Sequence, residues 1–245
     1  MIAKADPSGA LDTRAMLARS GIAAISNALL RRGLRNVCLT GLLPLAADQP
    51  AMVGPAYTLR FIPAREDIDT MAAYARSDNL HRRAIEECPA GCVLVIDARG
   101  ETRVSSAGDM MAARLVARGA AGLVTDGGFR DVPGIRNTGL PAYQRMAATA
   151  ATPIALHPLD LNGPIGCAGV AVYPGDMMVG DASGVVSIPS HLADEIAREA
   201  HEAALYEEFA EMQLARGRSL FGLFPATPES QTEYRAWLAA GRPKI

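Results

Sequence analysis

The sequence predicts an α/β fold built as one large domain. Of its 245 residues, 49% are hydrophobic, which is enough to bury a substantial core. Longer segments with apolar residues at helical spacing alternate with short apolar runs that glycine or proline bounds, the pattern of helices and buried strands. The chain contains neither an internal repeat nor a long Gly/Ser-rich or charged linker. A single domain is therefore the simplest organisation.

The first part of the chain predicts helices and strands in alternation. Residues 15–32 predict a first helix, and the apolar run near 52–61 predicts strands. The stretch 68–88 then predicts a helix that leads into a strand at 92–97.

A short helix and a short strand follow. Good helix formers with apolar residues at helical spacing predict a helix at 110–118, and Gly119 is its expected C-terminal cap. Asp109 therefore lies at a helix N-terminus, where backbone N–H groups are unpaired and the helix dipole favours negative charge. A ligand carboxylate could be held there by the amides from Gly108 to Met111, and glycine at 108 would allow it to approach closely.

The next strand brings further charged residues. The apolar run 121–125 predicts a buried strand that ends in the tight loop 126–128. Arg130 and Asp131 thus follow a strand end, a common position for ligand-binding groups in α/β folds. Together with Asp109 they provide two carboxylates and one guanidinium, which suit a hard metal ion bound with a carboxylate substrate.

A purely structural interpretation fits the same residues. Asp131 precedes Val132 and Pro133 and could cap a short helix, while Asp109 could be an ordinary residue of a helix N-terminus. Arg130 could be their ion partner at the surface. The spacing alone leaves both interpretations open.

The rest of the chain predicts mostly β structure and then one long helix. Beyond Pro141, short apolar segments bounded by glycine or proline predict strands as far as Pro189. Ser190 has the residue type of a helix N-cap, and apolar residues recur on one side from there to about Arg216. This helix is expected to pack on the core.

Asp109, followed after twenty residues by Arg130 and Asp131, resembles the signature of the RraA-like family. The enzymatic branch of that family contains class II pyruvate aldolases, which cleave 4-hydroxy-4-methyl-2-oxoglutarate and 4-carboxy-4-hydroxy-2-oxoadipate. The resemblance extends over residues 20–225, and an ordered set of blocks is more specific than any one of them. The further blocks similar to the family lie at residues 54–60, 91–97, 162–165, 172–176 and 179–185.

The resemblance implies the layered β/β/α swivelling-domain fold of this family, with a long C-terminal helix. It divides the chain into a lead-in at 1–20, a catalytic domain at 21–225 and a tail at 226–245. The tail is expected either to cover a neighbouring subunit or to be loosely ordered. Similar aldolases are homotrimers or hexamers with active sites at subunit interfaces, so Glu208 is a candidate contribution from a neighbouring subunit.

The resemblance also implies roles for the site residues. Asp131 would bind Mg²⁺, Mn²⁺ or another divalent metal, and Arg130 would contact the oxo-acid oxygens and stabilise the pyruvate enolate. Asp109 would orient water for proton transfer. The amides of residues 108–111, including those of Met110 and Met111, would hold the pyruvyl carboxylate. Oxaloacetate decarboxylation is an expected side activity, because it generates the same enolate.

Two alternatives remain within the same family. The site could serve a 2-keto-3-deoxy sugar acid, and Asn27, where relatives commonly carry aspartate, leaves the substrate range open. The family also contains inhibitors that bind ribonuclease E and lack aldolase activity. Those inhibitors typically replace the aspartate after the arginine, so Asp131 favours catalysis.

Composition argues against several other functions. A formal net charge of -2 and 5% aromatic residues give no sign of a nucleic-acid partner. The sequence lacks the HExxH, P-loop, GxSxG and dinucleotide-binding patterns. We expect a cytoplasmic protein without a membrane segment, because no stretch reaches the roughly 18 apolar residues that would span a bilayer. The four cysteines are expected to be reduced and mostly buried.

Overall fold

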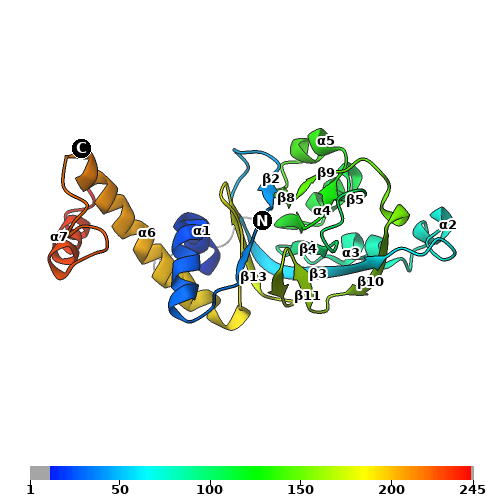
Figure 1. Ribbon diagram of the computed structural model, residues 1–245. Helices are drawn as coiled ribbons and strands as arrows, with labels where there is room; N and C mark the ends of the chain where they lie inside the picture. Colours follow the sequence, from blue (N-terminus) through cyan, green and yellow to red (C-terminus); the bar gives the residue numbers. More distant parts are fainter. Residues whose placement is uncertain (1–11, 244–245) are drawn as a thin grey trace.

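The computed structural model describes residues 12–243 and confirms a mixed α/β fold (Figure 1). Its main sheet has nine strands, and four neighbouring strands in it run parallel. The longest strand, β3, pairs with β13 near its start, β4 along its middle and β10 towards its end, so it joins the two halves of the sheet. In spatial order the strands are β1 (Cys38–Leu39), β14 (Gly184–Ile188), β13 (Met177–Asp181), β3 (Met52–Pro63), β4 (Val93–Asp97), β6 (Gly122–Thr125), β8 (Ala142–Gln144) and β2 (Leu43–Pro44), with β10 (Leu156–Leu161) also on β3.

A second sheet consists of three very short parallel strands. They are β5 (Ser105–Ala107), β7 (Gly128–Phe129) and β9 (Met146–Ala147). The sequence predicted one strand at 121–125, and this strand is present as β6. It did not predict β7, which begins three residues after β6 ends and belongs to the second sheet. Asp126 fixes the crossing, since its buried carboxylate accepts hydrogen bonds from the N–H groups of Ala98 (2.7 Å) and Gly100 (3.0 Å). Burial raises the pKa of Asp126, and these hydrogen bonds offset part of that shift.

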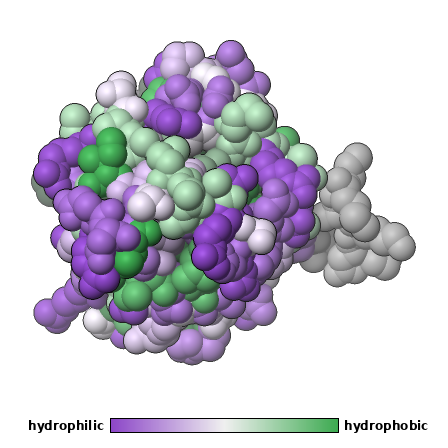
Figure 2. Space-filling view, turned by 90° about the vertical axis from the view of Figure 1, so that its right-hand side faces the viewer, coloured by the Kyte–Doolittle hydropathy of each residue, from purple (hydrophilic) through white to green (hydrophobic). Residues whose placement is uncertain are grey.

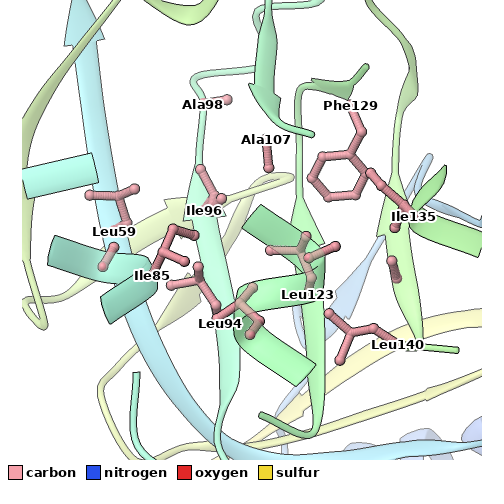
Figure 3. Packing of buried hydrophobic residues seen from close by; sticks show 14 of the residues in the cluster. Leu59, Ile85, Leu94, Ile96, Ala98, Ala107, Leu123, Phe129, Ile135 and Leu140 are labelled. Atoms are coloured by element: carbon pink, nitrogen blue, oxygen red, sulfur yellow. The ribbon is translucent and has the colours of Figure 1, made fainter. Parts of the chain in front are cut away.

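Helices cover one face of the main sheet, and a β-hairpin covers the other. All five residues of β4 are buried, which explains its continuous apolar run. Leu94 and Ile96 pack on the helical side, whereas Val93 and Val95 pack towards the hairpin. Figure 3 shows the helical side, where Ile85 lies close to Leu94. The covering elements are α3 (Leu80–Glu87), α4 (Asp109–Ala117), α5 (Val132–Asn137) and the hairpin of β11 (Ile165–Cys167) and β12 (Val170–Val172).

Two further helices pack together against β13 and β14. The first predicted helix is present as α1 (Thr13–Arg31), although Gly21, with φ 72°, interrupts it. The long predicted helix is α6 (Ala193–Ala215). Ser190 does not cap it, contrary to the prediction. Ser190 instead begins a separate 3₁₀ turn, and the N-cap residue Leu192 has no side chain that can accept a hydrogen bond.

The prediction of one continuous helix at 68–88 is also wrong. The chain forms α2 (Met71–Tyr74) and then α3, with the exposed residues 75–78 between them. Asn79 starts the second helix, because its Oδ1 accepts hydrogen bonds from the N–H groups of His81 and Arg82. Without a buried face on the connecting residues, no packing holds a continuous helix together.

The chain after Phe224 forms a helix, so of the two alternatives expected for the tail, loose order is wrong, and contact with a neighbouring subunit stays a prediction. Helix α7 (Pro228–Ala239) begins with a capping box between Thr227 and Ser230. Trp237 packs on Phe209 of α6, with ring centroids 5.7 Å apart. Figure 1 shows α7 at the outer end of α6, away from the main sheet. In the described part of the chain, none of the helices combines the length and apolar character of a membrane span.

The cysteines agree with the expectation of mostly buried thiols. Cys88 and Cys167 are buried, and Cys38 and Cys92 are half-buried. Burial raises the pKa of Cys88 to about 12, so this thiol is not a ready nucleophile.

The buried position of His81 predicts that the protein loses stability in mild acid. The side chain is fully buried between the rings of Phe61 and Tyr74, at centroid distances of 5.2 and 5.8 Å. Burial lowers its pKa from 6.5 to about 4, whereas in the unfolded chain it gains a proton below about pH 6.5. The stabilisation from the neutral imidazole is therefore complete above pH 6.5. As the pH falls towards 4 this stabilisation is lost, and the free energy of unfolding decreases by about 2 to 3 kcal/mol.

Denaturant unfolding at pH 7.5 and pH 4.5 checks this prediction. We expect His81→Leu to lose less stability than the wild type between the two pH values, because it has no imidazole to protonate on unfolding. His191→Leu, at an exposed position, serves as the control and should behave like the wild type. Equal pH dependence in the wild type and His81→Leu would contradict the assignment.

Candidate active site

The predicted site residues meet at the ends of two paired strands. Strand β5 leads directly into Gly108 and Asp109, and β7 leads directly into Arg130 and Asp131. Because β5 and β7 are parallel, both segments leave the small sheet at the same edge. The Arg130 N–H donates to the Ala107 carbonyl oxygen (3.0 Å) and ties the two strand ends together.

Buried side chains anchor both strand ends. Ala107 and Phe129 immediately precede the two site segments and are 2% and 0% exposed. Both belong to the core cluster on the helical face of the main sheet, and Figure 3 shows Phe129 beside Ile135 of α5. The core therefore fixes the backbone from which the polar groups project.

Arg130 and Asp131 form an ion pair that remains open to solvent. The Nε atom of Arg130 lies 3.2 Å from Oδ2 of Asp131, and the two side chains are 50% and 48% exposed. Gly108 leaves the space for this pair, since a Cβ atom at this position would lie 3.1 Å from each of these two atoms. Half-exposed groups in this arrangement can exchange partners when a ligand arrives.

The backbone of Asp131 is left-handed, with φ 53° and ψ 38°. Asp131 is the residue before α5, but its side chain makes no capping hydrogen bond. The interpretation of Asp131 as a helix cap is therefore wrong, because the left-handed conformation turns the carboxylate towards Arg130 rather than onto the helix. Non-glycine residues in this conformation cost free energy and concentrate at functional sites.

Asp109 begins α4, as predicted. Its Oδ1 accepts a hydrogen bond from the Met110 N–H (2.7 Å), and the Met111 N–H donates to the Gly108 carbonyl oxygen (3.1 Å). Within residues 12–243, the N–H groups of Gly108 and Asp109 donate to no other group. Of the amides predicted to bind a carboxylate, these two are the ones available at the helix N-terminus.

A depression of about 130 Å³ lies over these strand ends. Gly108, Asp109, Met110, Met111 and Arg130 all line it, whereas Asp131 lies beside the lining through its pair with Arg130. Sequence reasoning missed the remaining wall, which comes partly from β5, just before Gly108, and partly from two segments far away in the chain. The missed lining residues are Met71, Tyr74, Ser105, Ala107, Ala151, Thr152 and Pro153.

The donor set fits a hard cation that keeps most of its water. In the described residues, no three His, Cys, Asp or Glu side chains converge on one point, so a fully protein-coordinated metal does not fit. The half-exposed carboxylate of Asp131 could provide one anionic oxygen ligand, and its exposure would leave room for water and substrate oxygens. Mg²⁺ and Mn²⁺ accept such a set, because Mg²⁺ commonly binds through one or two carboxylates and retains several waters.

Glu208 lies elsewhere in the chain. It is on α6 and forms an ion pair with Arg242 near the C-terminus. Figure 1 places α6 beyond β13, at the other end of the molecule from α4 and α5. Within one chain, Glu208 does not approach Asp109 or Arg130.

The close approach of Gly134 to Asp109 predicts that a methyl group added at position 134 will disturb the site. A Cβ atom at this position of α5 would lie 2.7 Å from both Cβ and Oδ2 of Asp109. Gly134→Ala should therefore displace Asp109 and lower turnover by about tenfold or more, since misplacing a catalytic group by about 1 Å is costly. Thermal stability should change little, because alanine favours the helix by about 1 kcal/mol and offsets the local clash.

Turnover and thermal unfolding of Gly134→Ala and Gly166→Ala check this prediction. Gly166 is the control because a Cβ atom there would meet nothing within 4 Å. Full activity of Gly134→Ala would show that the position of Asp109 does not matter.

The chain was compared with known proteins. A family model described as Aldolase/RraA, RraA-like, matches residues 22–187. A relative from Halalkalibacterium halodurans carries the provisional name 4-hydroxy-4-methyl-2-oxoglutarate aldolase. It is 33% identical over 195 residues, which are 78% of this chain and 83% of the relative. A Xanthomonas campestris protein with the same provisional name is 38% identical over 128 residues, 51% of this chain and 75% of its own length.

A solved structure gives the same picture of the fold. Streptomyces coelicolor RraAS2, described as an unusual member of the RNase ES inhibitor RraA protein family, matches with a TM-score of 0.71 and 32% identity. The match covers 84% of this chain and 97% of the Streptomyces chain. Fold and site thus define a layered α/β protein with a depression at the ends of two parallel strands. The chain belongs to the RraA-like family.

Proposed function

We propose that this protein is a metal-dependent class II pyruvate aldolase, a carbon–carbon lyase. It cleaves a 4-hydroxy-2-oxo acid, such as 4-hydroxy-4-methyl-2-oxoglutarate, to pyruvate and a second carbonyl compound. The observation that carries this proposal is the meeting of Arg130 and Asp131 with the amides of Gly108 and Asp109 at two parallel strand ends. The provisional names of the relatives support the same reaction class.

The binding step uses the cationic and amide groups of the pocket. The N–H groups of Gly108 and Asp109 hold the pyruvyl carboxylate at the N-terminus of α4, where the helix dipole favours an anion. Arg130 lines the pocket and donates to the keto oxygen, so a positive charge faces the oxygen on which negative charge develops. Asp131 would hold Mg²⁺ or Mn²⁺, which supplies Lewis acidity towards that oxygen.

Bond cleavage requires a proton to leave the C4 hydroxyl and another to reach C3. Asp109 lies in the lining of the pocket and orients a water molecule that takes the hydroxyl proton. The C3–C4 bond then breaks, C4 becomes a carbonyl carbon and the electron pair forms the pyruvate enolate. Protonation at C3 completes pyruvate. Oxaloacetate reaches the same enolate when it loses carbon dioxide, so we propose this decarboxylation as a secondary activity.

The proposed enzyme acts in the cytoplasm as a homotrimer or hexamer. In such an assembly, Glu208 of a neighbouring copy could approach the pocket, although within one chain it pairs with Arg242. A divalent metal and a small 2-oxo acid are the proposed partners.

Pyruvate release from a substrate panel tests the proposal. The panel contains oxaloacetate, 4-hydroxy-4-methyl-2-oxoglutarate, 4-carboxy-4-hydroxy-2-oxoadipate and 2-keto-3-deoxy sugar acids, each with Mg²⁺ and with excess chelator. We expect release that chelator abolishes and added Mg²⁺ restores. Equal release in both conditions would contradict the metal requirement.

A second candidate function is regulation of a ribonuclease by binding. The similarity to Streptomyces coelicolor RraAS2 over most of both chains favours this candidate. It predicts no pyruvate release from any panel member by the folded, metal-loaded protein. It also predicts that added protein lowers the activity of ribonuclease E in a cleavage assay, which an aldolase without this role would not do.

A further inference from the structure

A second and larger cleft lies between helices at the other end of the molecule. Its volume is about 400 Å³, against about 130 Å³ for the depression at the candidate active site. Its walls come from α1, from α6 and from the chain between Phe224 and Tyr234, which includes the start of α7. The volume is within the range of pockets that hold small molecules.

The two pockets lie far apart on the molecule. The depression includes Met71 and Tyr74 of α2, and Figure 2 looks onto the end from which α2 projects in Figure 1, where hydrophobic patches lie between hydrophilic ones. Figure 1 shows α1, α6 and α7 at the opposite end. A ligand in the cleft would therefore not touch the groups proposed for carbon–carbon cleavage.

Helical spacing brings one stripe of each long helix to the cleft. On α1 the lining residues Ala24, Asn27 and Arg31 are three and four positions apart, so they lie on one face. On α6 the lining runs with the same spacing from Glu199 to Glu207. The wall from α6 onwards lies beyond residue 187, where the match to the family model ends. That match therefore gives this wall no role.

The cleft carries negative charge that no cation compensates. Its charged lining residues are Arg31, Glu199, Glu202 and Glu207. Arg31 is already engaged, since its Nε donates to Oε1 of Glu199 (2.7 Å), and Arg32 pairs with the same carboxylate. Within residues 12–243, neither Glu202 nor Glu207 forms an ion pair. Two carboxylates thus line the cleft without a cation.

Tyr234 adds a buried polar group without a partner. Its side chain lines the cleft and is 3% exposed, yet its hydroxyl forms no hydrogen bond with any described residue. Burial raises the pKa of this hydroxyl, and the carboxylate of Glu202 raises it further, so the two groups lie within electrostatic reach of each other. Arg242 acts in the opposite direction, but it pairs with Glu208 and does not line the cleft. A buried hydroxyl without a partner is unfavourable, and a ligand that bonds to it removes that cost.

The rest of the lining is mainly apolar and aromatic. Tyr206 and Tyr234 pack edge to face, with ring centroids 5.3 Å apart, and Phe224 and Pro225 line the cleft beside them. Phe224 is 48% exposed, so part of its ring is available to a ligand. Aromatic rings attract cations and also bind the apolar body that carries the charge.

We propose that this cleft binds an organic cation, namely a protonated amine on an apolar body. The ammonium group lies between the carboxylates of Glu202 and Glu207 and donates a hydrogen bond to the hydroxyl oxygen of Tyr234. The apolar body packs on Tyr206 and Phe224. The proposal is independent of the aldolase activity, because the cleft and the candidate active site share no lining residue.

Trp237 allows this binding to be measured directly. It is the only tryptophan of the sequence, it is 8% exposed, and its ring centroid lies 6.2 Å from that of Tyr234. A ligand against Tyr234 should therefore change the tryptophan fluorescence, and calorimetry gives an independent affinity.

Three probes of similar shape separate the effect of charge from that of apolar contact. Cyclohexylmethylamine, cyclohexylmethanol and cyclohexanecarboxylate are a cation, a neutral compound and an anion at pH 7.5. We expect the amine to bind the full-length protein at least about tenfold more tightly than the alcohol, and the carboxylate not to bind.

Variants of the lining make the test specific to this cleft. Glu202→Gln and Glu207→Gln should each weaken binding of the amine by about tenfold and leave binding of the alcohol unchanged. Tyr234→Phe should also weaken the amine but keep the thermal midpoint, because the hydroxyl that it removes has no partner in the free protein. Glu211→Gln, exposed on α6 outside the lining, is the matched control and should bind like the wild type.

Several results would overturn the proposal. Equal affinity for the three probes would do so, as would an affinity for the amine that neither glutamate variant changes. Absence of any response to the amine would overturn it too, and a lower mass of Glu202→Gln in solution would then assign the cleft to contact between copies of this chain. Arg130→Ala should bind the amine like the wild type, and loss of binding in that variant would place the amine at the candidate active site instead.

Discussion

Asp131→Asn is expected to abolish metal-dependent pyruvate release while leaving the fold intact. Asparagine, like aspartate, tolerates the left-handed backbone observed at this position, so the variant should retain the local conformation. It removes the negative charge that would hold the divalent cation. Loss of a side chain that only hydrogen-bonds to a metal ligand lowers activity by up to about a hundredfold. Because Asp131 would bind the metal directly, we expect kcat/KM to fall by more than this.

Steady-state assays over a range of Mg²⁺ concentrations, together with thermal unfolding, check this result. Asp67→Asn, at an exposed aspartate outside the pocket, is the control. Asp131→Ala should lose activity as well, but also about 1 kcal/mol or more of stability, because alanine is strained in the left-handed region. Wild-type activity in Asp131→Asn would exclude Asp131 as the metal-binding residue.

Arg130→Ala is expected to lose about 3 kcal/mol of transition-state stabilisation, or roughly a hundredfold in kcat/KM. The guanidinium lines the pocket, and Asp131 is its ion partner among the described residues. Its removal leaves the developing enolate charge without a cationic side chain. Arg130→Lys should recover part of the loss, since lysine restores the charge but not the paired donor geometry.

The same assay with Arg136→Ala provides the control, because Arg136 is exposed on α5 and does not line this pocket. If Arg130→Ala retained full kcat/KM for every substrate that releases pyruvate, the proposed role of the guanidinium would be wrong. A loss confined to KM would indicate binding of the carboxylate without stabilisation of the transition state.

The core of this site could be predicted from the sequence because its residues follow local patterns. The helix that begins at Asp109 has apolar residues at helical spacing, and the strand that ends at Thr125 is a short continuous apolar run, so Gly108 and Arg130 could be placed at element ends. Parallel strands then bring such ends to one edge of a sheet. The resemblance to a known family added the chemical roles, which spacing alone left open.

The other wall of the pocket could not be predicted, for physical reasons. Met71 and Tyr74 belong to a four-residue helix with no buried face, so no periodicity marks them. Strand β7 has two residues, too few to show any alternation, and its pairing with β5 depends on contacts across more than 20 residues of chain. The left-handed backbone of Asp131 likewise could not be predicted, because no sequence pattern around this residue indicates it.

That left-handed conformation has an evolutionary consequence. Glycine, asparagine and aspartate are the residues that adopt it at low cost, so the fold itself restricts which substitutions at position 131 a lineage can accept without losing stability. If Asp131 serves the proposed catalysis, a descendant that abandons it can replace the carboxylate with asparagine or glycine in one step and keep its structure. Among relatives with the same backbone at this position, the residue found there should therefore separate those under selection for chemistry from those retained for binding alone.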